Sequence, residues 1–448
     1  MELTKLKTLL KEGGVVGAGG AGFPSYAKLD EKADTIILNC AECEPLLRLH
    51  RQVLEINTYE ILSALEIVAE AVGAQNIIVG IKSSYTAALQ ALAAEKDNFP
   101  NIKISEMKSF YPTGDEVVLI YETTGRVVEP GALPISVGVT VFNVETMLNA
   151  YNIIKNNKPV TTKYVTITGE VANPTTLQVP LGITLKELVD MAGGATVKDP
   201  AYINGGPMMG KIANPFDVVT KTTNAVVVLP KNHHVINKKT ANISIDLKRA
   251  MASCCQCRMC TDLCPRHLLG HPINPSDFMR SATSGVTRNV APLINTVYCS
   301  QCGICEMYAC GQGLSPRTLI GEYKAGLRAE GYTPPKDVKG VGVLKERKYR
   351  RVPTYRIVTR LGLGKYDRPA PFEDKSATPK KVKIMLSQHI GAPAKTDLKE
   401  GDKVKTGQVI GRVDEKSLGA FVHSSVNGTV QRVTDKFVII KTDVKDGD

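Results

Sequence analysis

Two copies of one cysteine motif, both between residues 254 and 310, constrain this 448-residue chain more than any other feature. In each copy three cysteines recur at every third position, and a fourth follows after a longer gap. Eight of the eleven cysteines belong to the copies: Cys254, Cys257, Cys260 and Cys264 to the first, and Cys299, Cys302, Cys305 and Cys310 to the second. This run is typical of a 4Fe–4S cluster, for which a tight loop supplies three thiolates and a more distant cysteine supplies the fourth. The chain is therefore expected to hold two 4Fe–4S clusters and to move single electrons.

The spacing also predicts which cysteines share a cluster. In two-cluster ferredoxins the fourth cysteine of each run ligates the other cluster. We therefore expect the two fourth ligands to be exchanged between the motifs. One cluster is predicted on Cys254, Cys257, Cys260 and Cys310, and the other on Cys299, Cys302, Cys305 and Cys264. Cys255 breaks the spacing and is predicted to be a bystander.

Zinc and disulfides are the alternatives for these cysteines. Paired C-x-x-C knuckles commonly bind zinc, but zinc needs four ligands, and a third cysteine at the same short interval would be redundant. A disulfide framework is disfavoured because the chain starts without a secretory signal and is almost free of cysteine outside the motifs. Iron–sulfur clusters are therefore the favoured interpretation.

The formal net charge of +12 raises the question of nucleic-acid binding. The densest basic stretch runs over residues 339–360, but the chain has no nucleic-acid motif and only 5% aromatic residues. We therefore expect no nucleic-acid partner. The basic stretch is interpreted either as a solvated linker or as an arm docked on an acidic surface of a neighbouring domain or protein.

The distribution of apolar residues bears on location. No run of about twenty apolar residues occurs, so no membrane span is expected. The first residues form an amphipathic helical pattern with Leu3, Leu6, Leu9 and Leu10, unlike an export signal. Oxygen-labile clusters and reduced thiols agree with a cytoplasmic setting.

Hydrophobic periodicity and turn signals predict a multidomain α/β and α+β protein. Parallel strands are expected at 35–39 and 76–81 with a helix over 53–72 between them, and a later short helix is expected to begin near Thr184. The predicted parts are an α/β domain (1–158), a small α+β module (159–240), the cysteine module (241–333), a basic linker segment (334–381) and an all-β C-terminal module of hairpins (382–448).

A glycine-rich loop, Gly17 to Gly22, contains the pattern G-x-G-x-x-G. The dinucleotide-binding fingerprint needs a strand directly before the loop, whereas here an amphipathic helix ending at Gly13-Gly14 precedes it. We therefore expect a different fold from the standard dinucleotide domain. The glycines can still close backbone N–H groups on an anion, with Lys28 adding charge. A tight turn without a ligand is the alternative for this loop alone.

Four motifs follow one another in a fixed order: Gly17-Ala-Gly-Gly-Ala-Gly-Phe-Pro24, Asn39-Cys-Ala-Glu-Cys-Glu-Pro45, Tyr111-Pro-Thr-Gly-Asp-Glu116 and Asn143-Val-Glu-Thr146. Together they resemble the FMN- and NADH-binding subunit of respiratory complex I and the RnfC subunit of ion-pumping Rnf complexes. The resemblance implies that NADH stacks on a bound FMN. The residues it implies around FMN are Gly17, Gly19, Gly20, Gly22, Lys28, Asn39, Glu42, Tyr111, Gly114, Glu116 and Asn143. The chain departs from complex I subunits at Ala41, where those subunits have an acidic residue.

Two further segments resemble known modules. Residues 163–212 are similar to the soluble-ligand-binding β-grasp (SLBB) module, so the part 159–240 is called the β-grasp module. Residues 401–430 are similar to a biotinyl/lipoyl barrel-sandwich hybrid, in which the modified lysine would fall at Ser417. Lys416 is one residue off, and such a slip changes where the side chain points. The C-terminal module is therefore expected to be unmodified and structural.

The order of the modules resembles one family in particular. RnfC carries its barrel-sandwich module at the N-terminus, whereas here that module comes last, as in the PduS family of cobalamin reductases of bacterial microcompartments. This resemblance implies electron flow from NADH through FMN and both clusters to a corrinoid. It also implies a corrinoid adenosyltransferase and shell proteins as candidate partners, and a place in the cytoplasm or inside a microcompartment.

The expected chemistry needs cofactors more than side chains. A hydride carries two electrons and a 4Fe–4S cluster takes one, and a flavin is the usual converter between them. No catalytic acid or base is predicted, and electrons are expected to leave near the second cluster or the β-grasp module. The alternatives are an RnfC-like input subunit of a ferredoxin:NAD oxidoreductase and a non-catalytic electron-transfer or scaffold protein that lacks flavin.

Overall fold

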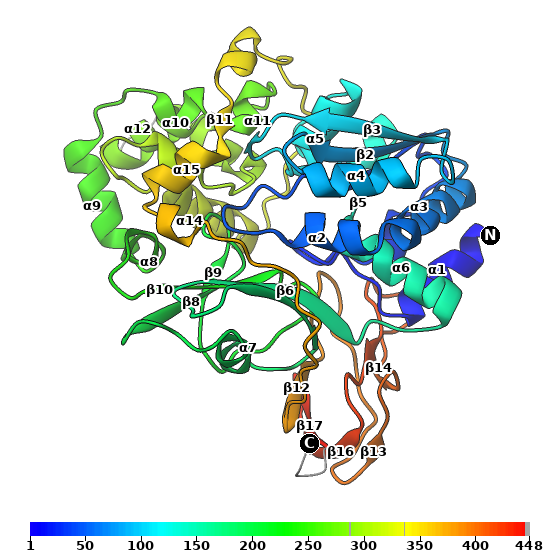
Figure 1. Cartoon of the computed structure of the whole chain (residues 1–448). Helices are drawn as coiled ribbons and strands as arrows, with labels where there is room; N and C mark the ends of the chain where they lie inside the picture. Colours follow the sequence, from blue (N-terminus) through cyan, green and yellow to red (C-terminus); the bar gives the residue numbers. More distant parts are fainter. Residues whose placement is uncertain (286–287, 336, 444–448) are drawn as a thin grey trace.

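A computed structural model describes residues 1–285, 288–335 and 337–443 (Figure 1). They form four packed modules, and the basic segment connects the third module to the fourth. The α/β domain and the helical cysteine module lie side by side. The β-grasp sheet runs beneath both, and the C-terminal strands extend below that sheet. The predicted mixed α/β and α+β class is confirmed.

The α/β domain is built on a four-stranded parallel sheet with the order β3-β2-β1-β5. Ile36 and Leu38 of β1 pack into the core on one face, and Ile37 packs against α5 on the other. An apolar run buried on both faces is what a central parallel strand requires. The elements are α1 (Leu3–Glu12), η1 (Ser25–Lys28), β1 (Thr35–Cys40), α2 (Leu49–Ile56), α3 (Thr58–Val72), β2 (Asn76–Lys82), α4 (Thr86–Ala94), β3 (Ile102–Met107), β4 (Phe110–Tyr111), α5 (Glu116–Thr124), η2 (Pro134–Val137), β5 (Val139–Asn143) and α6 (Val144–Asn156).

The single helix predicted over 53–72 is wrong, because the chain breaks at Asn57 into α2 and α3. The backbone of Asn57 has φ −128°, and its side-chain amide donates to the carbonyl of Val53. An asparagine side chain that bonds the backbone in this way competes with helix formation. The strands predicted at 35–39 and 76–81 are confirmed.

The strand order places a crevice at one edge of this sheet. The chain steps from β1 through β2 to β3 on one side and then returns to β5 on the other side of β1. Ligands bind such parallel sheets at the carboxyl ends of strands where the order reverses. Asn39 and Asn143 pair in register at the carboxyl ends of β1 and β5, so both lie at this reversal point.

The β-grasp module is a mixed five-stranded sheet with the order β7-β6-β10-β8-β9. The helix predicted near Thr184 is confirmed as α7 (Leu185–Met191), which Thr184 and Glu187 cap reciprocally. The strands are β6 (Thr162–Gly169), β7 (Thr175–Pro180), β8 (Pro200–Asn204), β9 (Lys211–Ala213) and β10 (Ala225–Pro230). The short helix α8 (His234–Lys239) leads from this sheet into the cysteine module.

The cysteine module consists of short helices around a small core. Ala250, Phe278, Leu319 and Ile320 form that core, with several cysteines packed at its border. Its elements are α9 (Ile243–Ser253), α10 (Met259–Asp262), α11 (Pro265–Leu268), α12 (Pro275–Ser284), α13 (Ala291–Ile294), η3 (Asn295–Tyr298), η4 (Cys305–Ala309) and α14 (Pro316–Ala329).

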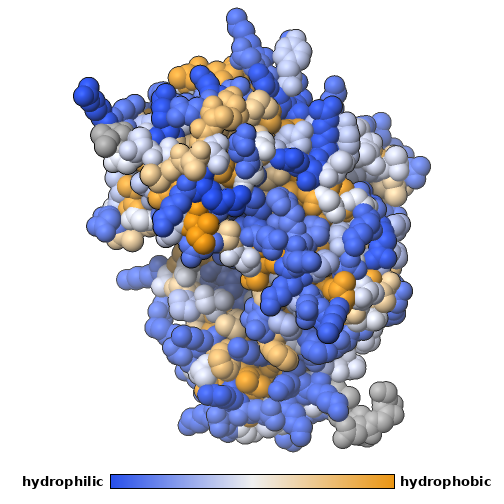
Figure 2. Space-filling view, turned by 90° about the vertical axis from the view of Figure 1, so that its left-hand side faces the viewer, coloured by the Kyte–Doolittle hydropathy of each residue, from blue (hydrophilic) through white to orange (hydrophobic). Residues whose placement is uncertain are grey.

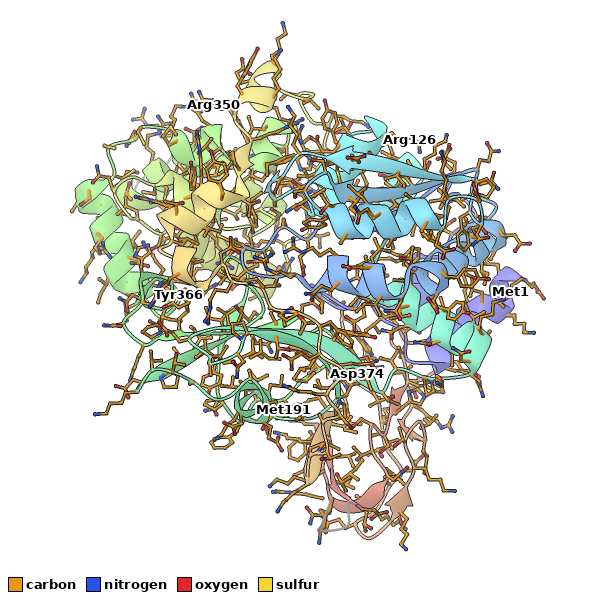
Figure 3. The ribbon with its side chains drawn as sticks, in the orientation of Figure 1. Met1, Arg126, Met191, Arg350, Tyr366 and Asp374 are labelled. Carbon is orange, nitrogen blue, oxygen red and sulfur yellow. The ribbon has the colours of Figure 1, made fainter. Side chains whose placement is uncertain are left out.

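The basic segment crosses the other modules as a packed arm. Arg347 and Arg351 both form ion pairs with Glu122 of α5, at 2.6 and 3.0 Å. The segment can be followed in Figure 3 from Arg350 past Tyr366 to Asp374 over the β-grasp sheet. Its elements are η5 (Lys345–Tyr349), β11 (Val352–Pro353), α15 (Thr354–Arg360) and η6 (Gly364–Tyr366), and β11 pairs with β4. These contacts agree with the interpretation of the basic stretch as a docked arm and not with a solvated linker.

The C-terminal module has a four-stranded sheet and a separate hairpin. The sheet contains β12 (Lys381–Met385), β13 (Lys403–Val404), β16 (Gly428–Val433) and β17 (Phe437–Thr442), and the hairpin is β14 (Val409–Gly411) and β15 (Val422–His423). Residues 444–448 of the predicted module lie outside the described residues. The hairpin tip rests on the α/β domain, where the Tyr26 hydroxyl donates to the Ser417 carbonyl at 3.4 Å. This docking favours the predicted structural role of the tip over a mobile modified arm.

Within the described ranges, no helix is both long and apolar enough to cross a bilayer. Figure 2 shows one face on which hydrophilic side chains predominate and apolar ones form small scattered groups.

Candidate functional site

A cavity of about 120 Å³ opens at the reversal point of the parallel sheet. Its walls come from the glycine loop, the ends of β1 and β5, and the first turns of α5 and α6. The lining residues are Gly17, Gly19, Phe23, Ser25, Lys28, Asn39, Glu116, Val141, Phe142, Asn143 and Thr146. Six of the residues predicted around FMN therefore meet at one cavity: Gly17, Gly19, Lys28, Asn39, Glu116 and Asn143.

The glycine loop is shaped by close approach and by left-handed backbone. A Cβ on Gly19 would lie 2.6 Å from the side-chain amide of Asn224, so a larger residue there would displace that side chain. Gly20 and Gly22 have φ of +62° and +69°, which glycine adopts without strain. These two residues form the turn of the loop and do not line the cavity.

The polar wall of the cavity is held by specific bonds. The Lys28 ammonium pairs with the Glu116 carboxylate at 2.9 Å and donates to the Val141 carbonyl at 3.0 Å. The Asn143 side chain accepts from the backbone N–H of Thr146 at 2.8 Å and caps the start of α6. A helix start, glycine N–H groups and an ammonium together suit a phosphate-bearing ligand. The residues present therefore fit the phosphate of FMN.

Besides Gly20 and Gly22, three predicted FMN residues lie outside the cavity lining. Glu42 is buried, accepts from the backbone N–H of His50 at 3.4 Å, and has one carboxylate oxygen without a hydrogen-bond partner among the described residues. The Gly114 carbonyl accepts from the Asn39 amide at 3.0 Å. Tyr111 is 1% exposed, and its hydroxyl donates to the Cys302 carbonyl at 2.6 Å. Gly114 thus supports a lining residue, whereas Tyr111 faces the cysteine module.

The first group of thiols, here called the outer thiol set, consists of Cys254, Cys257, Cys260 and Cys310. All four line one cavity of about 70 Å³. The thiol of Cys260 lies close enough to the thiols of Cys254, Cys257 and Cys310 to interact with them electrostatically. Cys257 is exposed, as is Cys255, which also lines the cavity. This set therefore reaches the molecular surface.

The second group, here called the inner thiol set, consists of Cys264, Cys299, Cys302 and Cys305. The thiol of Cys305 lies close enough to the thiols of Cys264, Cys299 and Cys302 to interact with them electrostatically. Cys302 and Cys305 are each 8% exposed. The structure therefore gathers the cysteines into the two groups with exchanged fourth members that the spacing predicts.

The chemistry of the thiols fits iron–sulfur clusters. Burial raises the pKa of Cys260 and of Cys302 to about 12, so a bare thiol at either position is protonated at neutral pH. A thiolate ligand there needs the positive charge of bound iron. Over the described part of the chain, no three or more His, Cys, Asp or Glu residues form a group able to hold a single metal ion.

Two contacts join the α/β domain to the segments that carry the inner thiol set, and the sequence did not reveal them. Arg266, two residues after Cys264, binds both carboxylate oxygens of Asp115 at 2.9 Å. Asp115 also caps α5, whose first residue Glu116 lines the cavity. The second contact is the bond from Tyr111 to Cys302. The sequence could have indicated Asp115 as a helix cap, because it directly precedes an apolar helix. It could not have indicated the partner Arg266, which lies 151 residues away along the chain.

A loop of the β-grasp module braces the same region. The Glu44 carboxylate accepts from the backbone N–H groups of Met208 and Met209 at 2.8 and 2.6 Å. Lys239 and Arg317 both donate to the Met208 carbonyl at 3.1 Å. Burial raises the pKa of Glu44. Glu44, of the second motif, was not among the predicted site residues, and it positions this loop between two other modules.

Family comparisons assign each module. The chain matches the models of the Nuo51 FMN-binding domain over residues 10–152, the SLBB domain over 164–211, a 4Fe-4S dicluster domain over 253–315 and the RnfC barrel sandwich hybrid domain over 371–446. The fold and the site thus define a flavin and iron–sulfur oxidoreductase with FMN and 4Fe–4S clusters as cofactors. This confirms the predicted architecture and cofactors.

Curated relatives identify the family within this class. The chain is 39% identical over 441 residues to the cobalamin reductase PduS of Citrobacter freundii, covering 97% of this chain and 96% of the relative. It is 38% identical over 442 residues to the PduS of Salmonella typhimurium strain LT2, with the same coverage. One component of the Na(+)-translocating ferredoxin:NAD(+) oxidoreductase complex of Acetobacterium woodii is 31% identical over 284 residues, covering 62% of this chain and 61% of the relative. The chain belongs to the PduS family, as its module order predicts.

Proposed function

We propose that the protein is an NADH-dependent cobalamin reductase. In this proposal electrons pass from FMN to the inner cluster, then to the outer cluster, and then to a corrinoid. The observation that carries this order is the difference in burial between the thiol sets, together with the bonds that join the inner set, and among the described residues not the outer one, to the α/β domain. Nearly full-length similarity to two cobalamin reductases supports the corrinoid acceptor.

The proposed ligands follow the two thiol sets. Cys264, Cys299, Cys302 and Cys305 would hold the inner cluster, and Cys254, Cys257, Cys260 and Cys310 the outer one. The exposed Cys257 favours the first motif as the exit for electrons, instead of the second motif or the β-grasp module expected from the sequence. Cys255 lies at the exit and has no proposed ligand role.

The protein residues bind and orient the cofactors. The glycine loop and Lys28 would hold the FMN phosphate, and Asn39 with Asn143 would orient the flavin at the sheet edge. Bound FMN supplies the conversion of one hydride into single electrons. The bonds from Tyr111 and Arg266 keep the inner thiol set fixed against the α/β domain. No acid or base is needed among the side chains.

Association with a corrinoid adenosyltransferase or with shell proteins, and a place in the cytoplasm or inside a microcompartment, remain parts of the proposal that rest on family membership. The N-terminal helix α1 bears on packaging. Its Leu6 and Leu10 are fully buried in the core of the α/β domain. This favours a structural role for α1 over a free packaging tag.

The test is anaerobic NADH oxidation by the purified, reconstituted protein with a panel of acceptors: cob(III)alamin, ferredoxin, quinone and artificial dyes. We expect flavin absorbance above a broad cluster absorbance, and reduction of cob(III)alamin. Clusters without flavin would indicate an electron-transfer protein, and preference for ferredoxin would indicate an RnfC-like input subunit. Absence of iron and acid-labile sulfide after reconstitution would remove the proposal altogether.

A further inference from the structure

A segment of the β-grasp module, Thr220–Asn224, packs against the glycine loop. The Lys221 ammonium donates to the Gly14 carbonyl at 2.7 Å, just before the loop. A Cβ on Gly19 would lie 2.6 Å from the amide of Asn224, and one on Gly22 would lie 2.7 Å from the methyl group of Thr222. The segment therefore contacts the chain just before the loop, and the loop itself at its middle and its end.

Lys221 joins three modules through one amine. It is 1% exposed and donates to the carbonyl of Gly14 in the α/β domain and to that of Phe421 in the C-terminal module, at 2.7 and 2.8 Å. Burial lowers the pKa of Lys221 to about 7. A lysine buried this deeply is costly unless its hydrogen bonds are satisfied, and here backbone carbonyls supply the acceptors. The bonds to Gly14 and Phe421 therefore tie the approach to the glycine loop to the C-terminal module.

The C-terminal module also contacts the loop directly. The backbone N–H of Ile390 donates to the Ala21 carbonyl at 3.1 Å. The Gln388 side chain accepts from the backbone N–H of Lys221 at 3.0 Å. Both the β-grasp and the C-terminal modules thus contact the loop.

Asn224 has an unsatisfied polar atom beside the cavity. Its side-chain oxygen is buried and has no hydrogen-bond partner among the described residues. Its amide approaches Gly19, which lines the cavity, and the amide of Asn143 lies 3.5 Å from the same Cβ position. A buried carbonyl oxygen without a donor is unfavourable, so a ligand that supplies an N–H or O–H would be favoured there. FMN carries both kinds of donor.

We propose that Thr220–Asn224 belongs to the FMN-binding site, with Asn224 contacting the bound flavin and Lys221 acting as a positioning residue for the glycine loop. This proposal rests on FMN binding by the α/β domain. It assigns the β-grasp and C-terminal modules a part in flavin binding beyond their own folding. It also explains why the glycine loop carries Gly19 and Gly22 at the two positions where side chains of another module approach.

The test is the FMN dissociation constant of the full-length protein with its clusters loaded and its flavin removed, measured by quenching of flavin fluorescence. We expect Asn224→Ala to weaken FMN binding about tenfold, the effect of losing one or two hydrogen bonds. Lys221→Met should weaken it at least as much. Asn237→Ala is the matched control in the same module, since the Asn237 amide donates to a backbone carbonyl away from the glycine loop. This control should bind FMN like the wild type.

Iron content and the Tm of the flavin-free protein separate positioning from folding. Weaker FMN binding with both values unchanged supports the proposal, and wild-type affinity in both variants overturns it. Should Lys221→Met fail to fold, the affinity of Asn224→Ala decides. A wild-type protein that binds no FMN would instead contradict the proposed function itself.

Discussion

The two thiol sets have nearly the same spacing in the sequence but occupy different surroundings. The inner set includes Cys302 and Cys305, each 8% exposed, and it is joined to the α/β domain by Tyr111 and Arg266. The outer set opens to solvent at Cys257. A repeated motif therefore fixes the chemistry of both sites without giving them the same role. Under the proposed function, the packing around each site decides which one receives electrons and which one delivers them.

The difference arises from contacts between modules. Cys302 packs in a core that includes Met208 of the β-grasp module, Ile357 of the basic segment and Tyr111 of the α/β domain. Cys254 and Cys310 of the outer set pack against residues of their own module, such as Phe278 and Leu319. Residues of three other modules thus pack around Cys302, whereas Cys299 of the inner set borders the same core as Cys254 and Cys310.

Removing one ligand from each set should give the largest contrast. Cys302→Ala should abolish the inner cluster and reduce NADH-driven transfer to every cluster-dependent acceptor to background, because no relay remains beside the flavin. Cys257→Ala should stop transfer to cob(III)alamin while the inner cluster still accepts electrons from NADH. Anaerobic EPR of the NADH-reduced variants distinguishes the two outcomes.

Cys255→Ala is the control for the outer set, since Cys255 lines the same cavity without a predicted ligand role. It should keep the iron content of the wild type. Loss of iron in this variant, or retention of both clusters in Cys257→Ala, would contradict the ligand assignment. An inner cluster that NADH cannot reduce in Cys257→Ala would reverse the proposed order.

Exposure to air should separate the sets by rate. Because each 4Fe–4S cluster holds the same amount of iron, we expect about half of the iron to be lost in a fast phase, from the exposed outer cluster, and the rest in a slower phase. Chelator-trapped iron release, followed over time, measures both phases. A single phase would show that the difference in burial does not protect the inner cluster.

Acid should weaken the contact between the α/β domain and the cysteine module. The ring of His271 bonds the Val128 carbonyl at 3.0 Å, and burial lowers the pKa of His271 from 6.5 to about 4. The folded state therefore binds fewer protons than the unfolded state between pH 6.5 and 4, so stability falls as the pH drops through this window. We expect a loss of about 2 kcal/mol between pH 7 and pH 5. Urea unfolding of the wild type and of His271→Gln measures it, and an equal pH dependence in both would exclude His271 as the cause.

How far the sequence predicted the site depends on whether local spacing or distant packing sets each feature. The exchanged thiol sets and the six lining residues of the flavin cavity follow from spacing and motifs. The difference in burial between the two thiol sets does not follow from spacing, because the contacts that produce it join distant positions. The bond from Tyr111 to Cys302 spans 191 residues. Asn224 was missed for the same reason, since a different module brings it to Gly19. The break at Asn57 was missed because the apolar periodicity continues through it.

The bond between Tyr111 and Cys302 gives the smallest expected effect among the tests of the difference between the inner and outer thiol sets. Tyr111→Phe removes one buried hydroxyl and leaves the ring, so the inner set keeps its packing and loses one hydrogen bond to the α/β domain. The expected cost is about 1 kcal/mol of unfolding free energy. Pre-steady-state reduction of the inner cluster should slow a few-fold, because the thiol set is held less rigidly against the flavin domain. Tyr121→Phe, on the same domain but away from both thiol sets, is the matched control. If both variants reduce the inner cluster at the wild-type rate, the bond is structural only, and burial alone distinguishes the inner set from the outer set.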